Sequence, residues 1–402
     1  MLAPGSFALT LLLSFLTALG PLSMDMYLPS LPDIAHSLSG SVVQAQLTIA
    51  SYLFGFAVGQ IIYGPTSDRF GRRPVLLVAI ALYGAATVAC ALAQSIDALI
   101  AARFVQALGG AGAVVLARAV VRDIHSGVRA GRELSLMGSI TAFAPIVAPM
   151  IGGVLQTAFG WRATFILLLA LAAVASTAAA FLLPETLKTR SAGPVSLAAM
   201  AALYKSVLVH RGFLANLGII TTVFVGLFAW IGGAPMVMQG AAYGLSPLAF
   251  GIAFATGAAG YMIGAFVASR IVMRFGLDRL MGIGVVMMAF GGLAMVAVLA
   301  LGLGHVMWFA GTMVVYLAGL GFTLPMAMAA ALTPFPDRAG TASSVMGFCQ
   351  QAGAALTAAG IGLFLGASAW PVALLVAAAG VIGYLLWALT RKARLADLSG
   401  FS

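Results

Sequence analysis

Two ionisable residues stand inside otherwise apolar segments of this chain. Asp25 follows a long apolar run, and Arg103 lies near the start of another one. A charged side chain in hydrocarbon costs a few kcal/mol, so such residues usually face a cavity or an opposite charge. A desolvated carboxylate that meets and then loses a neighbouring cation can alternately bind and release a proton. We therefore predict that Asp25 binds and releases a proton, with Arg103 as the neighbouring cation that helps to release it.

A second polar group is the segment Gly64–Pro74, which holds Asp68, Arg69 and Arg72 between two apolar segments. Its glycines, Gly64 and Gly71, permit a tight reversal of the chain, and a proline suits the first turn of a helix. We therefore predict a short charged loop between two helices.

The elements that carry these groups must be membrane helices. The 402 residues are 62% apolar and 7% charged, whereas soluble domains carry about 25% charge. Runs of about 20 apolar residues span a bilayer as helices, and a barrel would show short alternating strands. We predict an all-α integral membrane protein with helices at 6–28, 43–63, 74–93, 98–121, 133–155, 161–183, 212–238, 246–269, 280–302, 305–332, 341–365 and 369–390.

The basic residues predict the orientation. With a cytoplasmic N-terminus, 17 of the 20 fall on the inner side, as the positive-inside rule requires. This distribution explains the net charge of +10 without nucleic acid, and both termini are expected in the cytoplasm. The inner residues are Arg69, Arg72, Arg73, Arg122, Arg129, Arg132, Lys188, Arg190, Lys205, Arg211, Arg270, Arg274, Arg279, Arg338, Arg391, Lys392 and Arg394.

The chain repeats itself weakly. Arg69-Phe70-Gly71 returns as Arg274-Phe275-Gly276, and a second match joins residues 130–138 to 339–347. Parallel six-helix halves are a known transporter plan. We expect an N-terminal bundle at 1–183, a cytoplasmic linker at 184–211, a C-terminal bundle at 212–390 and a cytoplasmic tail at 391–402.

The charged segment Gly64–Pro74 resembles the GxxxDRxGRR signature of the major facilitator superfamily. The resemblance implies twelve helices in two pseudo-symmetric halves, with Asp68 docking near a helix start around Gly340 and Thr341 in one conformational state. Met273 takes the place of the Asp in the second half. The residues expected to form this conformational gate are Gly64, Asp68, Arg69, Gly71, Arg72, Arg118, Arg122 and Asp123.

Other motifs narrow the resemblance. Ser23–Pro29 resembles the SxDMYLP signature of the bicyclomycin and chloramphenicol resistance (Bcr/CflA) drug–proton antiporters. Arg103–Gly112 resembles a proton-coupling motif, RxxQGxG, with Ala107 in place of the usual glycine. The stretch around Pro149, Gly152 and Gly153 is similar to the GPxxGG antiporter motif.

The substrate path is expected to use uncharged polar and aromatic residues on the cavity helices. Amphipathic compounds suit large apolar pockets with a few polar groups. The candidates are Tyr27, Gln106, Trp230, Tyr261, Tyr316, Gln350 and Gln351.

Together these features predict a multi-pass transporter of the bacterial inner membrane, expected to be a monomer in the lipid bilayer. It would export small drugs in exchange for protons, with Asp25 and Arg103 coupling the two. The four histidines show no metal spacing, and no ATP-binding loop is present, so the proton gradient is the expected energy source and no cofactor or metal is expected. Two alternatives stay open: an exporter of an endogenous metabolite such as an amino acid or siderophore, and a non-transporting membrane sensor.

Overall fold

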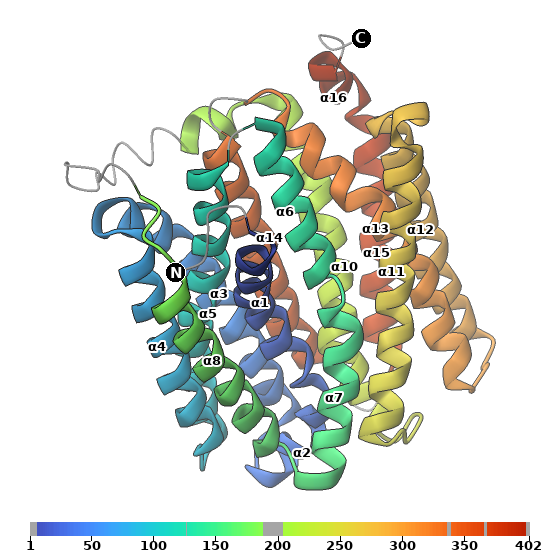
Figure 1. The fold of residues 1–402 in the computed structure, drawn as a ribbon. Helices are drawn as coiled ribbons and strands as arrows, with labels where there is room; N and C mark the ends of the chain where they lie inside the picture. The colour runs from blue at the N-terminus through green and yellow to red at the C-terminus, as the bar shows by residue number, and fades with distance from the viewer. Residues whose placement is uncertain (1–5, 126, 188–203, 336–338, 366–367, 399–402) are drawn as a thin grey trace. The chain divides into compact units, whose positions relative to one another are not determined.

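The computed structural model describes residues 6–125, 127–187, 204–335, 339–365 and 368–398. Every regular element among them is helical (Figure 1). The chain is divided into two compact units. Residues 1–195 and 246–251 form the first, and residues 196–245 and 252–402 form the second. The residues at which the predicted bundles, linker and tail begin and end remain a prediction.

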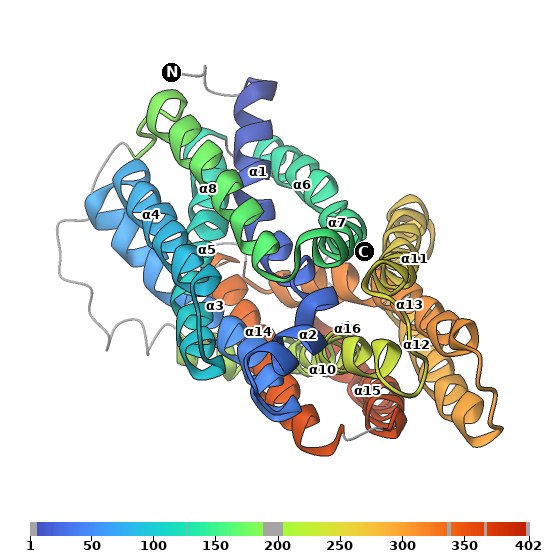
Figure 2. The ribbon, with the colours of Figure 1, turned by 90° about the horizontal axis from the view of Figure 1, so that it is seen from below.

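The helices of the first unit begin with α1 and end with α8 (Figure 2). Their bounds are α1 (Phe7–Asp25), the 3-10 turn η1 (Leu28–Ser30), α2 (Leu31–Ser37), α3 (Val42–Phe70), α4 (Arg72–Ala91), α5 (Ile96–Ile124), α6 (Gly127–Thr141), α7 (Ala144–Phe159) and α8 (Arg162–Leu182).

The long helices described for the second unit run from α10 to α15, and the short α16 follows them (Figure 1). They are α10 (Arg211–Gln239), α11 (Pro247–Phe275), α12 (Leu277–Ala300), α13 (Val306–Leu332), α14 (Ala339–Phe364), α15 (Trp370–Leu389) and α16 (Arg391–Leu398).

Among the described residues, eleven helical stretches are long and apolar enough to cross a membrane. α14 is a further long helix, and it matches the eleventh predicted span. The all-α membrane fold predicted from hydropathy is therefore confirmed. Small residues let the helices approach closely, as at Gly55 on α3, where an added Cβ would collide with the carbonyl oxygen of Phe104 on α5.

The segment predicted as a loop at Gly64–Pro74 is helical over most of its length. α3 continues through Pro65 to Phe70, so Gly64 is not a turn residue and the predicted loop is wrong there. The Thr66 hydroxyl donates to the Ile62 carbonyl at 2.7 Å and the Ser67 hydroxyl to the Gly64 carbonyl at 2.9 Å, so side-chain hydrogen bonds add to the backbone ones next to the proline, which has no N–H to donate. The reversal is confined to Gly71, whose φ of 103° favours glycine.

Other ends differ from the sequence prediction for similar reasons. The predicted helix at 133–155 is two helices, α6 and α7, separated before Pro145. The predicted first helix ends at Asp25 and is followed by η1 and α2, each with a proline in its first turn. The described part of the predicted tail is helical, since α16 spans Arg391–Leu398.

The first unit has an apolar core built from five of its helices. Leucines on one side of α1 pack with residues of α4, α5, α6 and α8. The core positions on α1 are Leu9, Leu12, Leu13, Leu16 and Leu19. This packing fixes α1 along its length and holds Asp25, its last residue, at one end of the bundle.

Candidate functional site

Asp25 closes α1 and is almost fully buried, with 6% of its surface exposed. Among the described residues, none donates a hydrogen bond to its carboxylate or lies within ion-pair distance of it. α1 begins at Phe7, just after its cap residue Ser6, and 18 further helical steps of 1.5 Å place Asp25 about 27 Å along the helix axis. Asp25 therefore lies at the far end of the first span, as the sequence indicated.

Arg103 lies two turns into α5 and is completely buried. Its Nη1 donates to the backbone carbonyl of Ser23 at 3.1 Å and to the Gln106 Oε1 at 2.7 Å. The first contact brings the guanidinium to the end of α1, two residues before Asp25. The structure brings the two predicted residues to neighbouring positions of the first unit without an ion pair between them.

A chain of buried hydrogen bonds surrounds Arg103. The Gln106 amide donates to the Thr87 hydroxyl at 2.9 Å, and Thr87 donates to the Tyr83 carbonyl at 2.6 Å. The Tyr83 hydroxyl lies 2.6 Å from the Ser23 hydroxyl. These contacts join α1, α4 and α5, and they hold Gln106 as a structural partner of Arg103.

α7 packs tightly against the chain just beyond Asp25. A Cβ added to Gly152 would collide with the backbone carbonyl of Met26. Pro149, Gly152 and Gly153 are all buried on α7. The small residues of the antiporter-like motif therefore allow one helix to lie on the backbone beside the candidate proton site.

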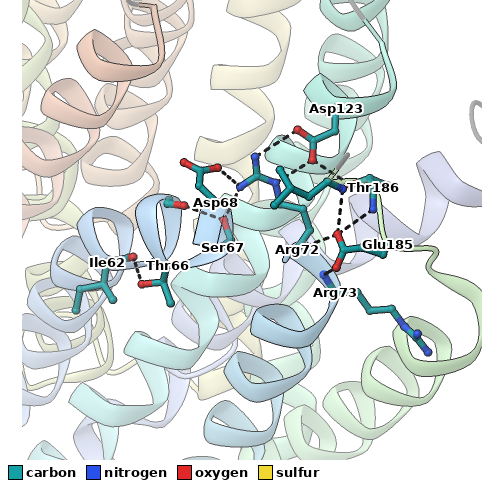
Figure 3. Close-up of polar contacts among 11 residues, drawn as sticks. Ile62, Thr66, Ser67, Asp68, Arg72, Arg73, Asp123, Glu185 and Thr186 are labelled. Atoms are coloured by element: carbon teal, nitrogen blue, oxygen red, sulfur yellow. Dashed lines mark hydrogen bonds and ion pairs between the residues drawn. The ribbon is translucent and has the colours of Figure 1, made fainter. Parts of the chain in front are cut away.

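The charged residues around Gly71 form a network shown in Figure 3. Arg72 pairs with Asp68 at 2.6 Å and with Asp123 at 2.8 Å, so one guanidinium joins the end of α3 to the end of α5. The Thr186 hydroxyl adds a hydrogen bond to Asp123 at 3.0 Å. Asp68, Arg72 and Asp123 are thus brought together as predicted.

The remaining predicted gate residues are outside this network. Arg69 lies over the ring of Phe70 at 5.3 Å, and Arg118 and Arg122 are exposed. Within the described residues, neither Arg118 nor Arg122 makes an ion pair. The structure therefore does not place Arg118 and Arg122 in the charge cluster that was predicted for them.

Glu185 is a member of the network that the sequence did not single out. Its carboxylate accepts from the backbone N–H groups of Arg72 at 3.0 Å and Arg73 at 3.2 Å, which begin α4. A carboxylate is favoured there because the first N–H groups of a helix lack partners and the dipole is positive. An acid directly after a span, facing a basic helix start in another loop, is the signal that could have identified it.

The candidate substrate residues divide into two groups. Tyr27 and Gln106 of the first unit are fully buried, and their polar atoms form hydrogen bonds with other residues of the same unit. In the described part of the second unit, Trp230, Tyr316 and Gln350 each have a buried polar atom without a hydrogen-bond partner, namely Nε1, OH and Nε2.

Trp230 lies beside the rings of Phe254 and Phe309, whose centroids are 6.4 and 5.6 Å away. The last two candidates, Tyr261 and Gln351, are half-buried. The unpaired polar atoms of the second unit fit a substrate path better than the paired ones of the first.

The model of the major facilitator superfamily matches residues 13–240. The chain belongs to the major facilitator superfamily. It is 31% identical to the bicyclomycin resistance protein homolog of Haemophilus influenzae over 85% of each chain. It is 33% identical to a chloramphenicol resistance protein of Pseudomonas aeruginosa, over 91% of this chain and 86% of the relative.

A solved D-xylose–proton symporter shares the fold, with a TM-score of 0.72 and 17% identity over 94% of this chain and 97% of the symporter. The molecule is thus a transporter rather than an enzyme, and a multi-pass bacterial membrane protein. Membership of the superfamily, expected from the charged motif, is confirmed.

Proposed function

We propose that this transporter exports small amphipathic compounds, such as chloramphenicol or bicyclomycin, in exchange for protons by alternating access. The observation that carries the proposal is Asp25, a buried carboxylate at the end of a membrane helix with no bound counter-charge among the described residues. The printed names of the two relatives, each more than 30% identical, support the choice of substrate.

Each step of the cycle uses a group described above. Asp25 takes a proton while the carrier is open to the acidic outer side, and the protonated carrier returns inward. Drug binding then displaces the proton to the cytoplasm, with Arg103 stabilising the ionised carboxylate. One charge crossing 100 mV is worth about 2.3 kcal/mol, which at one proton per cycle supports a concentration ratio of roughly forty.

The network of Asp68, Arg72 and Asp123 acts in this scheme as a switch at the inner side. Among the described residues, the half-exposed Asp68 is bound only through Arg72, whereas Asp123 is held by both Arg72 and Thr186. Asp68 is therefore the carboxylate that can leave the network during a conformational change. The scheme places both termini in the cytoplasm, the protein in the inner membrane, and one chain per working unit.

Purified protein in proteoliposomes with an imposed pH gradient tests the proposal. Chloramphenicol should dissipate the gradient through the wild type, and Asp25→Asn should abolish this exchange. Asp97→Asn removes an exposed carboxylate from the first turn of α5 and serves as the matched control, with exchange within twofold of wild type. Exchange at the wild-type rate in Asp25→Asn would show that the coupling assignment is wrong. A gradient that no drug dissipates through the wild type would favour a metabolite exporter.

A further inference from the structure

The guanidinium of Arg103 lies among aromatic rings. Its central carbon is 4.1 Å from the centroid of the Tyr52 ring and 4.5 Å from that of Tyr27. The Phe165 ring is further away, at 6.0 Å. Cations are attracted to ring faces within about 6 Å, and most strongly where water is excluded. Two tyrosines from different elements, α3 and the segment after α1, thus contact one buried charge.

No carboxylate balances this charge. Only Nη1 of Arg103 is hydrogen-bonded, to neutral oxygens, while Nε and Nη2 have no partner among the described residues. No Asp or Glu of the described chain lies within ion-pair distance of the guanidinium. A buried cation without compensation is unstable, so the ring faces and the oxygens of Ser23 and Gln106 must supply the compensation.

The two rings are themselves fixed. The Tyr52 hydroxyl donates to the backbone carbonyl of Gly20 on α1 at 3.0 Å. The Tyr27 hydroxyl lies 2.7 Å from the Thr48 hydroxyl. Thr48 already donates to the Ala45 carbonyl, so Tyr27 is the donor. Each ring is held at its polar end by α1 or α3 and presents its face to Arg103.

We propose that Tyr52, together with Tyr27, positions Arg103 for coupling by taking the place of a permanent counter-carboxylate. This inference rests on the proposed proton-coupled function. An opposite charge at close range favours the ionised form of a carboxylate, so a lasting pair with Arg103 would prevent Asp25 from taking up a proton. The rings hold Arg103 near Asp25 without that pair, and its Nε and Nη2, which have no partner among the described residues, remain available for a transient one.

Two transport assays with chloramphenicol in proteoliposomes separate positioning from folding. One measures accumulation driven by a pH gradient, and the other measures exchange of labelled for unlabelled drug without a gradient. A purely structural defect lowers both, whereas a coupling defect lowers the ratio of the first to the second. Tyr52→Leu removes the ring face, and we expect this ratio to fall at least tenfold. Tyr52→Phe keeps the face and should restore the ratio to within threefold of wild type.

Tyr63→Leu is the matched control. It removes a tyrosine from the same helix, eleven residues further on and outside the contacts of Arg103, and its ratio should equal that of wild type. If Tyr52→Leu keeps the wild-type ratio, or if Tyr63→Leu lowers the ratio equally, the proposal is overturned.

A size-conserving series covers the case in which Tyr52→Leu fails to fold. Phenylalanines with increasing numbers of ring fluorines at position 52 weaken attraction to a cation at nearly constant volume. The ratio should fall as fluorines are added, and a ratio independent of fluorination overturns the proposal. The proposed function itself fails in a different way, through a wild type without gradient-driven transport or an Asp25→Asn variant that retains it.

Discussion

The terminal helix α16 is tied to the start of α12 by one buried arginine. Arg394 is 1% exposed, and its Nε donates to the Asp278 carboxylate at 3.0 Å. Nη2 lies 2.9 Å from the same oxygen without the alignment of a hydrogen bond, so it adds charge attraction only. Nη1 donates to the Thr390 hydroxyl at 2.6 Å, and the Trp387 indole donates to the Asp278 carbonyl at 3.2 Å. This tie predicts an asymmetry between the two single variants.

Asp278→Asn should be the more damaging change. It leaves a buried guanidinium without a counter-charge, and breaking a buried pair in this way costs about 3–5 kcal/mol. Because the Asp278 side chain is 14% exposed, we take the lower end, about 3 kcal/mol. Arg394→Leu instead removes the buried charge and leaves Asp278 in the first turn of α12, where the helix dipole favours it by roughly 0.3–1 kcal/mol. We expect Arg394→Leu to cost about 1 kcal/mol.

Limited trypsin digestion of the detergent-purified protein measures these costs. Arg391 and Lys392 are exposed at the start of α16, and cleavage there follows the opened population when closing is fast. The two costs correspond to a cleavage rate about 150-fold faster for Asp278→Asn and about fivefold faster for Arg394→Leu. Arg279→Leu, a change at an exposed neighbouring arginine, should leave the rate within twofold. If Arg394→Leu proved as fast as Asp278→Asn, the reasoning from buried charge would be refuted.

Two further predictions concern the first unit. Gly152→Val places a branched side chain against the Met26 carbonyl and should cost about 1–3 kcal/mol, seen as a lower midpoint of thermal unfolding, whereas Gly138→Ala, in open space, should leave the midpoint unchanged. Thr10→Val removes the hydroxyl that donates to the Glu133 carboxylate at 2.7 Å and should cost about 1.5–3 kcal/mol in the same measurement, while Glu133→Gln, which keeps an acceptor oxygen, should cost less.

Hydropathy predicted the helices well because burial in lipid imposes a long uniform apolar run. It located ends poorly wherever proline or a charged helical segment intervened. α3 extends seven residues beyond the predicted end at 63, through Pro65, where the Thr66 and Ser67 hydroxyls donate to nearby carbonyls. The break between α6 and α7 arises from prolines inside a stretch that hydropathy reads as continuous.

Only the charged residues of the candidate site could be predicted, because a charged residue in an apolar segment stands out in the sequence. Asp25 and Arg103 are conspicuous for that reason, and both are buried in the first unit. Tyr52 was not singled out, because a tyrosine in a membrane helix is ordinary until its ring is found 4.1 Å from a buried guanidinium. Aromatic partners depend on helix packing angles, and residue spacing along one helix contains no information about them.

Each half has a polar contact just after its sixth membrane helix. The residue that makes the contact is acidic in the first half and basic in the second. In the first unit, Glu185 follows α8 and accepts from the start of α4. In the second unit, Arg394 follows α15 and pairs with Asp278 in the first turn of α12. Met273 is 95% exposed at the position that corresponds to Asp68. A polar link at this place is thus common to both halves, whereas the position of Asp68, the carboxylate that we propose leaves its partner, holds Met273 in the second half. This difference, rather than the fold that the halves share, is why we propose that the first unit switches and carries the proton.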